Sequence, residues 1–446
     1  MTYTSHTDAE RREMLETIGL EKIEDLFADI PKKMRASALE LDGPLSETEV
    51  RREFARIADG NCDMTCSLFL GAGSYHHFIP AALSHLVMRS EFYTAYTPYQ
   101  AEASQGMLQS IYEYQSMMCE LTGMDVSNAS MYDGATALYE AAIMAMRCAR
   151  KRTRIIVDEC INPLYRNVLA TYAGNLDLEL VHVPAKDGHT DVEAIAATLD
   201  DKTAAVLVSN PNFFGVVQDF SELAGKVHEY KALLVMSVNP VALGALKTPG
   251  EMGADIVTGE AQPFRSPMFF GGPYIGFMTT REKYVRKMPG RIISETVDED
   301  GERGFVMTLQ TREQHIRREK ATSNICTNQG LLSLTVAVYL SLIGRDGFTA
   351  LAEQNISKAA YAKKALTKVE GVSLKWKSPA FNEFVLSLPQ DAEKVIENLT
   401  AEEKIVGGLP LKRYYEGMDN DVLVCVTEMN TREQIDEYAA ALGRLI

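Results

Sequence analysis

The turn at residues 260–263 lacks the residue type that its surroundings lead one to expect. An apolar segment, Ala254–Thr258, precedes the turn Glu260-Ala-Gln-Pro263, and a Gly-Gly-Pro sequence follows at residues 271–273. Enzymes that bind an aldehyde cofactor often present a lysine in such a turn, because its amine holds the cofactor as a Schiff base until substrate displaces it. No lysine occurs between Lys247 and Lys283. The chain therefore has another architecture, or it is a subunit that lost this lysine and works beside one that kept it.

A glycine turn at the start of a predicted helix could bind an anion. The sequence Asp133-Gly-Ala-Thr136 precedes an apolar helical pattern. Backbone N–H groups at a helix N-terminus attract negative charge, glycine permits close approach of a phosphate, and Thr136 adds a hydroxyl. The alternative is a helix capped by Asp133, in which the glycine serves only the turn. The sequence leaves both interpretations open.

Three tyrosines and a glutamine lie close together between residues 93 and 100. Tyr93, Tyr96, Tyr99 and Gln100 belong to a segment that also contains Pro98. An extended loop of this kind can line a polar pocket, because each ring packs while its hydroxyl points inward. A surface or interface loop with aromatic anchors is the alternative, and the two roles are compatible.

The segment 318–329 is rich in small hydroxyl and amide groups. Thr322, Ser323, Asn324 and Thr327 stand just before a strongly apolar helical pattern. Their side chains and backbone N–H groups offer hydrogen-bond donors to an anion. The segment is therefore a candidate for contacts with a phosphate.

Two glycines precede Pro273. Gly271 and Gly272 have no side chain, so the backbone can pass close to another group. That group could be the cofactor of another subunit. A tight turn between two structural elements is the alternative.

The composition excludes several classes of function. The chain has 446 residues and a formal net charge of -16, which argues against nucleic acid as its main partner, because phosphate binding needs clustered Lys and Arg. No run of about 18 apolar residues occurs, so no membrane span is expected. The N-terminus lacks the basic-then-apolar build of a signal peptide. We therefore expect a cytoplasmic protein with one large core and a smaller domain.

Cysteine and histidine residues do not form a recognisable metal site. Cys62 and Cys66 make a CxxxC pair, but no second pair or histidine cluster completes it. His76 and His77 are adjacent and cannot face one metal together from regular structure, so a structural or hydrogen-bonding role is expected for both. The seven cysteines are expected to be free thiols.

The hydrophobic pattern divides the chain into three predicted parts. Residues 1–65 form a helical N-terminal arm, residues 66–330 a large domain, and residues 331–446 a small C-terminal α/β domain. The arm shows helical spacing of apolar residues over 8–18, 20–30 and, more weakly, 50–58. Periodicity does not decide whether the arm packs on its own domain or on a partner.

The large domain alternates predicted helices and strands. Its predicted strands are 154–157, 178–183, 204–208, 233–237, 256–258 and 275–279. Alternation implies crossover connections, and hence an α/β fold with a mostly parallel sheet covered on both faces. Ligands of such sheets bind at the carboxyl ends of the strands. Two helices, 328–343 and 356–369, are predicted to follow, and the first is expected to be a buried core helix.

Several motifs are spread along most of the chain. They are Phe69-Leu-Gly-Ala-Gly-Ser-Tyr75, Tyr96-Thr-Pro-Tyr-Gln-Ala-Glu102, Tyr114-Gln-Ser-Met-Met-Cys-Glu-Leu-Thr-Gly-Met124, Asn128-Ala-Ser-Met-Tyr-Asp-Gly-Ala-Thr-Ala137 and Ala321-Thr-Ser-Asn-Ile-Cys-Thr-Asn-Gln329. In this order they resemble the glycine dehydrogenase (decarboxylating) family, the P-protein of the glycine cleavage system. The similarity is to subunit 1 of the two-chain form of that protein.

The resemblance implies a fold-type-I pyridoxal-phosphate architecture and a heterotetramer of two subunits 1 and two subunits 2. It also implies three cofactor anchors in the catalytic subunit: a ring-stacking histidine, an aspartate beneath the pyridine nitrogen, and the lysine. This chain has Thr136 at the first place, Val238-Asn-Pro240 at the second, and Gln262 and Pro263 at the third. Three losses in separate segments predict that it does not hold its own pyridoxal phosphate.

The resemblance further implies a shared reaction. Subunit 2 would hold pyridoxal phosphate covalently, and the pair would decarboxylate glycine and transfer an aminomethyl group to the lipoyl group of H-protein. This chain would supply part of the active-site wall. The expected contacts to substrate or cofactor edge are Tyr93, Tyr96, Tyr99 and Gln100. Those near the cofactor phosphate are Thr322, Ser323, Asn324 and Thr327, with Gly271 and Gly272 permitting close approach.

Two alternatives remain open at this point. The chain could be a self-sufficient pyridoxal-phosphate enzyme, related to aminotransferases or desulfurases, that uses Lys320 or Lys247. Lys320 lies among charged residues rather than after an apolar strand, which disfavours it. The chain could also be a pure scaffold whose pocket no longer matters.

Overall fold

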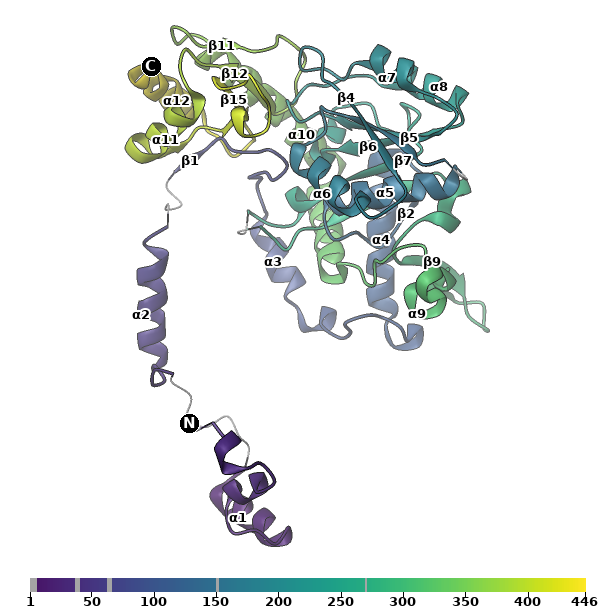
Figure 1. Cartoon of the computed structure of the whole chain (residues 1–446), viewed down its shortest axis with the longest axis vertical. Coiled ribbons are helices and arrows are strands. Elements are labelled where there is room, and N and C mark those ends of the chain that lie inside the picture. The colour runs from purple at the N-terminus through teal and green to yellow at the C-terminus, as the bar shows by residue number, and fades with distance from the viewer. Residues whose placement is uncertain (1–5, 37–40, 62–65, 150–151, 269–270) are drawn as a thin grey trace. The chain divides into compact units, whose positions relative to one another are not determined.

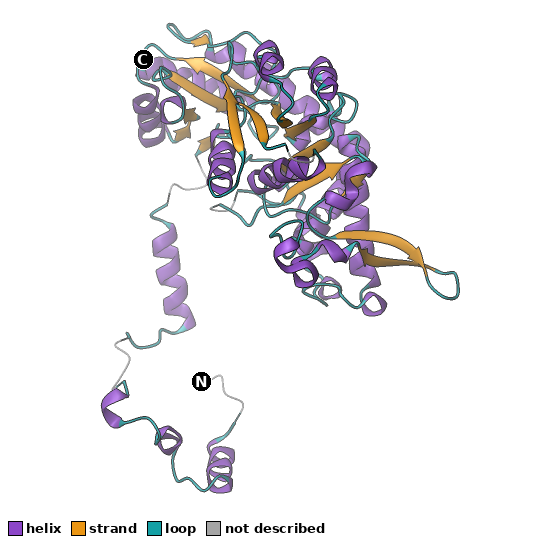
Figure 2. Cartoon of the chain, turned by 45° about the vertical axis from the view of Figure 1, so that its right-hand side comes forward, coloured by secondary structure: helices purple, strands orange, loops and turns teal. Residues whose placement is uncertain are grey.

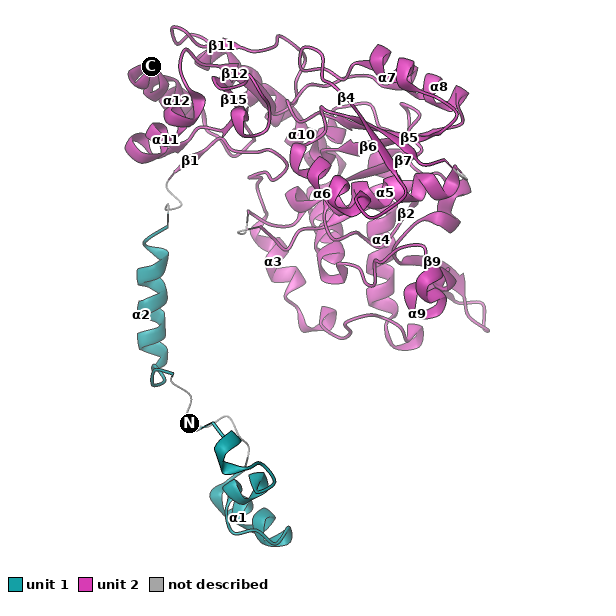
Figure 3. Ribbon diagram, viewed as in Figure 1, with its two compact units in different colours: residues 1–64 teal, residues 65–446 magenta. Residues whose placement is uncertain are grey.

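The chain forms two compact units. The computed structural model describes its 446 residues apart from short segments, namely residues 1–5, 37–40, 62–65, 150–151 and 269–270 (Figure 1). The first unit comprises residues 1–64 and the second residues 65–446 (Figure 3). Cys62, one half of the CxxxC pair, lies outside the described residues.

The first unit contains short helices. α1 (Asp8–Thr17) and α2 (Glu47–Ala58) agree with two of the predicted helices, and a capping box begins each of them. The predicted helix over 20–30 is wrong, because only the 3-10 helices η1 (Ile23–Phe27) and η2 (Lys32–Met34) form there. So short a helix does not propagate when no packed surface supports it.

Apolar side chains of the first unit are exposed. None of its described residues is buried. The large exposed apolar residues are Met14, Ile18, Ile23, Leu26, Phe27, Ile30, Met34, Leu41, Leu45, Val50, Phe54 and Ile57. The described part of this unit therefore has no hydrophobic core of its own.

A seven-stranded sheet forms the centre of the second unit. Its order is β2-β8-β7-β6-β5-β3-β4; the pairs from β7 to β4 are parallel, and β8 is antiparallel to both β7 and β2. The strands are β2 (Val126–Ser127), β3 (Arg154–Asp158), β4 (Glu179–Val183), β5 (Thr203–Asn210), β6 (Leu233–Val238), β7 (Ile256–Glu260) and β8 (Gly276–Thr280). The prediction of a mostly parallel sheet is confirmed.

Helices cover both faces of this sheet (Figure 1). Successive residues of a strand face opposite sides. Ile155 and Val157 of β3 therefore pack in one core and Ile156 in the other. The first core includes α5 (Gly134–Cys148) and α6 (Pro163–Ala173). The second includes α4 (Gln105–Thr122), α7 (Val192–Thr198), α8 (Ser221–Glu229) and part of α10 (Gly330–Leu366).

A separate core surrounds a small antiparallel sheet near the C-terminus. Its order is β11-β12-β15-β14. The elements are β11 (Ser373–Leu374), β12 (Glu383–Ser387), α11 (Ala392–Glu403), β14 (Leu409–Pro410), β15 (Asp421–Cys425) and α12 (Arg432–Leu445). β1 (Ser67–Leu68) pairs with β13 (Ile405–Val406), which places the segment after residue 68 close to this sheet.

α10 connects the two cores of the second unit. Two helices were predicted here, and the element consists of two helical parts that meet at a kink at Gly344, whose φ is +58°. The first part ends at Gly344 as predicted, but the second begins directly after the kink and not at residue 356. Leu332 and Val336 pack under the large sheet, whereas Ala359 and Leu366 pack under the small one. By length and composition α10 is the one described helix that could cross a membrane. Its buried residues show that it packs as a core helix.

One β-hairpin of the second unit was not predicted from the sequence. β9 (Ile292–Val297) and β10 (Arg303–Thr308) pair in antiparallel fashion and project from the body (Figure 2). The hairpin packs against α4 through Ile293 and Phe305. The short helices α3 (Ala81–Val87) and α9 (Gln314–Arg317) complete the second unit.

Candidate functional site

A pocket lies at the carboxyl ends of the parallel strands, where ligands of such sheets bind. Its cavity is about 50 Å³, and a neighbouring cavity of about 370 Å³ shares Tyr165 and Glu260 with it. We call the smaller one the sheet-edge pocket; it is lined by residues including Tyr75, Tyr165, Ser237, Asn239, Glu260 and Glu383. Ligand sites for drug-sized molecules are usually about 300 Å³ or larger. The sheet-edge pocket is therefore nearly filled by side chains of the chain itself.

Gln262 stands where a lysine would be expected, and it holds Tyr75 in place. Its Oε1 accepts a hydrogen bond from Tyr75 N at 3.0 Å, and its Nε2 donates to the carbonyls of Tyr75 and Ser266 at 3.0 and 2.8 Å. The Gln262 side chain is fully buried. The Tyr75 hydroxyl in turn donates to Glu383 at 2.8 Å. The turn at residues 260–263 thus fixes a segment that fills the pocket.

Two carboxylates occupy the N-terminus of α5. Asp133 Oδ1 accepts hydrogen bonds from Ala135 N and Thr136 N, both at 2.9 Å. Glu260 accepts from Gly134 N at 3.0 Å. These carboxylates use the N–H groups that a phosphate would need, and their charge repels an anion. The structure therefore supports the capped-helix interpretation of this turn.

The expected aspartate anchor beneath the pyridine nitrogen is also missing. Asn239 follows β6 where an aspartate would be needed, and its Oδ1 accepts from Val241 N at 3.0 Å. Neither described cavity at this edge is lined by a lysine. Lys247 instead donates to Ser221 at 2.8 Å, and Lys320 lines a different cavity. The residues present do not fit pyridoxal phosphate in this chain's own pocket.

Burial perturbs two glutamates of the sheet-edge pocket. Burial raises the pKa of Glu260 to about 7, although the N–H groups of Gly134, Ile275 and Gln262 act in the opposite direction. Burial likewise raises the pKa of Glu383 to about 7, against the hydrogen bonds from Ala72 and Tyr75. Both groups therefore bind protons more tightly in the folded chain than in the unfolded chain.

These pKa shifts predict that stability falls as the pH rises. Glu383 has a folded pKa of about 7, above its unfolded value, so its stabilising contribution is complete at low pH and is lost as the pH rises toward 7. We expect the urea midpoint to decrease less between about pH 5 and about pH 8 in Glu383→Gln than in the wild type. Glu416→Gln, at an exposed position, is the control and should keep the wild-type slope. Parallel curves for all three proteins would contradict the assignment.

Arg291 connects the two predicted site segments. Its side chain is buried, with Nη2 donating to the Tyr99 hydroxyl at 2.9 Å and Nη1 to Thr97 Oγ1 at 3.2 Å and to Asn328 Oδ1 at 3.4 Å. The guanidinium also lies 5.3 Å from the centre of the Tyr99 ring. Its Nε makes no hydrogen bond but lies 3.9 Å from the Glu313 carboxylate. The tyrosine loop and the 318–329 segment are thus neighbours.

The remaining residues of the tyrosine loop are open to solvent. The side chain of Tyr96 is 90% exposed, and Tyr93 and Gln100 are also exposed. The Tyr93 hydroxyl donates to the sulfur of Met88 at 3.1 Å. These side chains line neither of the two cavities described above, and they are available to another molecule.

The 318–329 segment runs along α5 and is anchored by its backbone. Gln329 N donates to Ser130 Oγ at 2.9 Å, and Cys326 N to the Tyr132 hydroxyl at 3.1 Å. The predicted polar residues make local contacts. Ser323 Oγ accepts from Ile325 N, Asn324 Oδ1 accepts from Gln314 Nε2, Thr327 Oγ1 donates to the Asn328 carbonyl, and Thr322 N donates to the Arg312 carbonyl. Of these four, Asn324 is the exposed one.

The two glycines adopt conformations that other residues rarely reach. Gly271 has φ +93° and Gly272 φ +132°. A Cβ added to Gly271 would meet no described atom of the chain within 4 Å. Here the glycines serve the backbone conformation. Any group that approaches Gly271 closely would have to come from outside the described chain.

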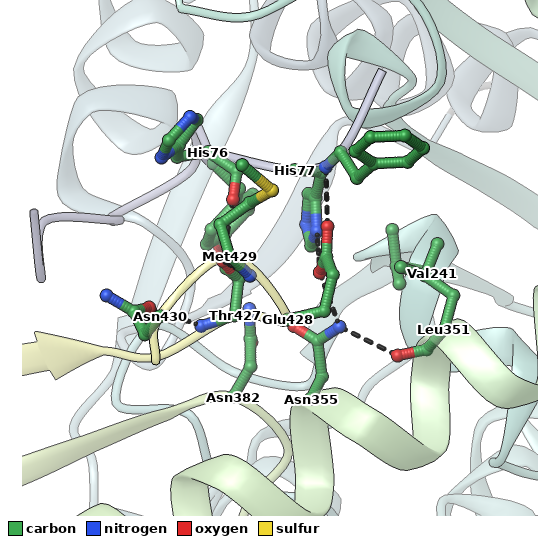
Figure 4. A network of polar contacts seen from close by, with 12 residues as sticks. His76, His77, Val241, Leu351, Asn355, Asn382, Thr427, Glu428, Met429 and Asn430 are labelled. Carbon is green, nitrogen blue, oxygen red and sulfur yellow. Dashed lines mark hydrogen bonds and ion pairs between the residues drawn. The ribbon is translucent and has the colours of Figure 1, made fainter. Parts of the chain in front are cut away.

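His77, two residues after Tyr75 in the sequence, belongs to a buried polar network (Figure 4). His77 Nδ1 lies 2.8 Å from Glu428 Oε2, and Asn355 Nδ2 of α10 donates to the same oxygen at 2.9 Å. Burial favours a raised pKa for Glu428, but the contact with His77 and the hydrogen bonds from Phe78 and Asn355 together outweigh it, and the pKa is lowered. The expected hydrogen-bonding role of His77 is confirmed. No described group of three or more His, Cys, Asp or Glu residues could hold a metal ion.

The strand order and the position of the sheet-edge pocket define the class of fold-type-I pyridoxal-phosphate enzymes. A sphingosine-1-phosphate lyase from Burkholderia pseudomallei shares this fold, with a TM-score of 0.67 at 14% identity over 94% of each chain. Residues 1–442 match the family described as glycine cleavage system P-protein. The chain belongs to that family.

Relatives match the chain over its full length. It is 50% identical over 447 residues to a protein of Desulforamulus reducens named "Probable glycine dehydrogenase (decarboxylating) subunit 1", with all of both chains covered. A protein of the same name from Maridesulfovibrio salexigens is 51% identical, with 99% of each chain covered. A crystal structure of glycine decarboxylase (P-protein) of the glycine cleavage system, in inhibitor-bound form, superimposes with a TM-score of 0.91 at 42% identity over all of both chains.

Proposed function

We propose that this chain is the lysine-lacking subunit of a two-chain glycine decarboxylase. It would assemble with subunit 2 as an α2β2 heterotetramer, and subunit 2 would hold pyridoxal phosphate covalently. The complex would decarboxylate glycine and transfer the aminomethyl group to the lipoyl group of H-protein. Pyridoxal phosphate supplies an electron sink for loss of carbon dioxide. The single observation that carries the proposal is that Gln262, hydrogen-bonded to Tyr75, stands at the turn where a lysine is expected, beside a small sheet-edge pocket in a member of this family.

The exposed loops support a role at another chain's site. Arg291 holds Tyr99 beside Asn328, while Tyr96 remains almost fully exposed. A monomer seldom fixes an exposed loop from beneath with a buried arginine unless the loop's position matters, because burying a charge is costly. We propose that Tyr93, Tyr96, Tyr99 and Gln100 complete the wall of the site in subunit 2. Thr322, Ser323, Asn324, Thr327, Gly271 and Gly272 would lie near the cofactor that subunit 2 holds.

The two alternatives have less support. A self-sufficient enzyme would need a lysine in the pocket, but Lys247 is engaged with Ser221 and Asp219, and Lys320 lies beside other cations. A pure scaffold would have no use for the buried arginine beneath the tyrosine loop. The acidic composition is consistent with a cytoplasmic complex.

Reconstitution tests the proposal. The isolated chain mixed with pyridoxal phosphate should show no visible absorbance from lysine-bound cofactor and no glycine–carbon dioxide exchange. The mixture with subunit 2 should show both, and borohydride should label a peptide of subunit 2 only. A labelled lysine peptide from this chain would establish the self-sufficient alternative instead.

A second experiment distinguishes an active-site wall from a pure scaffold. Tyr96→Ala combined with Gln100→Ala should lower the exchange rate of the reconstituted complex by about 10-fold or more, because the wall positions substrate. Leu176→Ala, at an exposed apolar position that lines neither cavity of the candidate site, is the control and should leave the rate unchanged. Full activity in the double variant would favour the scaffold.

A further inference from the structure

A concave surface of basic residues lies at the C-terminal end of α5, the end remote from Asp133 and the sheet-edge pocket. We call it the basic cavity. It has a volume of about 460 Å³, and its described lining contains no acidic residue. Its cations are Arg147, Arg286, Lys287, Arg312, Arg317 and Lys320. Such a cluster is unusual in a chain whose formal net charge is -16.

One of these cations builds the cavity. Arg312 donates from Nε to the Leu309 carbonyl and from Nη2 to the Gly290 carbonyl, both at 3.0 Å, and also donates to the Met288 carbonyl. Arg312 therefore ties the start of the 318–329 region to the end of η7 (Glu282–Lys287). Its role is explained without a ligand.

Four other cations have no such explanation. The side chains of Arg147, Arg286, Lys287 and Lys320 are exposed to solvent and make no hydrogen bond or ion pair with any described residue. They come from three separate elements, α5, η7 and η9 (Arg318–Lys320). Cations near a helix C-terminus are individually favourable, which accounts for Arg147 and Lys287 one at a time. This helix-end effect does not explain why all four side chains line the basic cavity together, since like charges repel.

The surroundings of Arg147 point the same way. Burial lowers the pKa of Arg147, and Glu140, two turns earlier on α5, only partly offsets this effect. Glu140 is itself buried and does not line the cavity. Arg147 is nonetheless exposed to solvent, so its guanidinium can reach a ligand in the cavity.

We propose that the basic cavity binds a small anion carrying two or more negative charges, of the phosphoryl class. The volume falls in the range of small-molecule sites, whereas a protein partner would be better served by a flat surface. Guanidinium groups match phosphoryl oxygens through paired N–H donors, and lysines add point charges. This site is separate from the sheet-edge pocket. Thr322, which the proposed function places near the cofactor of subunit 2, also lines it, but anion binding to this chain alone can be tested without subunit 2.

Binding of inorganic pyrophosphate to the full chain tests the proposal. Calorimetry at roughly 50 mM salt should show saturable 1:1 binding, because screening is weak at that ionic strength. Arg147→Met combined with Lys287→Met should raise the Kd by about 10-fold or more, consistent with the loss of two charged contacts. Inorganic phosphate serves as a second probe and should bind more weakly if two phosphoryl groups are recognised.

The matched control removes the same charges elsewhere. Arg345 and Lys364 are exposed residues of α10, remote in sequence from the cavity lining. Arg345→Met combined with Lys364→Met should leave the Kd within about twofold, as expected for exposed charges. Absence of saturable binding, or an equal loss in the control, would overturn the proposal. Weaker assembly of the cavity variant with an acidic partner, without pyrophosphate binding, would overturn it in favour of a protein interface.

Discussion

Replacing Arg291 by methionine should lower the glycine–carbon dioxide exchange rate of the reconstituted two-chain complex by about 100-fold. The variant loses the hydrogen bonds from Arg291 to Thr97, Tyr99 and Asn328. These bonds fix two loops that the proposed function places at the site of subunit 2. Misplacement of a positioning group by about 1 Å can cost a factor of about 100 in rate.

The position of Arg291 makes the effect specific. The side chain is only 4% exposed, so water cannot take the place of the guanidinium between the tyrosine loop and the 318–329 segment. Lysine supplies charge but not the planar donor geometry. Arg291→Lys should therefore recover only a small part of the activity. We expect the loss mainly in kcat, with a smaller change in the KM for glycine, because the loops are misplaced rather than removed.

The control lies on the neighbouring hairpin. Arg303 is exposed, pairs with Glu295 at 2.8 Å and lies over the Phe305 ring. Arg303→Met should change the rate by less than about twofold, since exposed ion pairs contribute little. Thermal unfolding and assembly with subunit 2 should be measured for each variant. An Arg291→Met complex that assembles and retains full activity would show that the loops have no part in the reaction.

Replacing Gln262 by alanine should destabilise the chain by about 3 kcal/mol or more. The substitution removes three hydrogen bonds and leaves backbone groups of Tyr75 and Ser266 without partners. Gln262 is fully buried, so its replacement also leaves a cavity. Each buried polar group left unsatisfied costs about 1–3 kcal/mol. The urea midpoint at neutral pH measures the effect.

A glutamine on the surface provides the comparison. Gln390 is exposed and makes a single hydrogen bond, to the Leu445 carbonyl at 3.0 Å. Gln390→Ala should shift stability by no more than about 0.5 kcal/mol. Equal midpoints for the two variants would mean that Gln262 does not hold the segment that fills the sheet-edge pocket. The turn at residues 260–263 would then have no structural role.

Local patterns in the sequence predicted most of the fold. The strands of the large sheet follow from short apolar runs such as Ile155–Val157, because a strand buried on both faces has no polar side to reveal. The long amphipathic helices were predicted as well. The hairpin at 292–308 was missed, since Ile292–Val297 becomes polar and exposed toward its end. The end of the first helix at Gly344 was predicted correctly, but the second helix begins directly after this kink and not at residue 356.

Some features of the candidate site could likewise be predicted from the sequence, and others could not. The missing lysine, the missing aspartate and the replaced histidine are properties of single positions, namely Gln262, Asn239 and Thr136. The sequence alone was therefore enough to predict a chain without covalent hold on a cofactor. It also marked the tyrosine loop and the 318–329 segment as polar and unusual. It gave no sign of Arg291, which looks like any arginine before an apolar strand.

What the sequence determined was which groups are present and the local structure around them, because residue type and periodicity act over a few positions. The tertiary structure decided what those groups do. Gln262 meets Tyr75 across 187 positions, Glu260 meets Gly134 across 126, and Arg291 meets Tyr99 across 192. Contacts over such separations depend on how the strands and loops pack, which no local pattern encodes. The filled pocket and the linked loops therefore appeared only once the chain was folded.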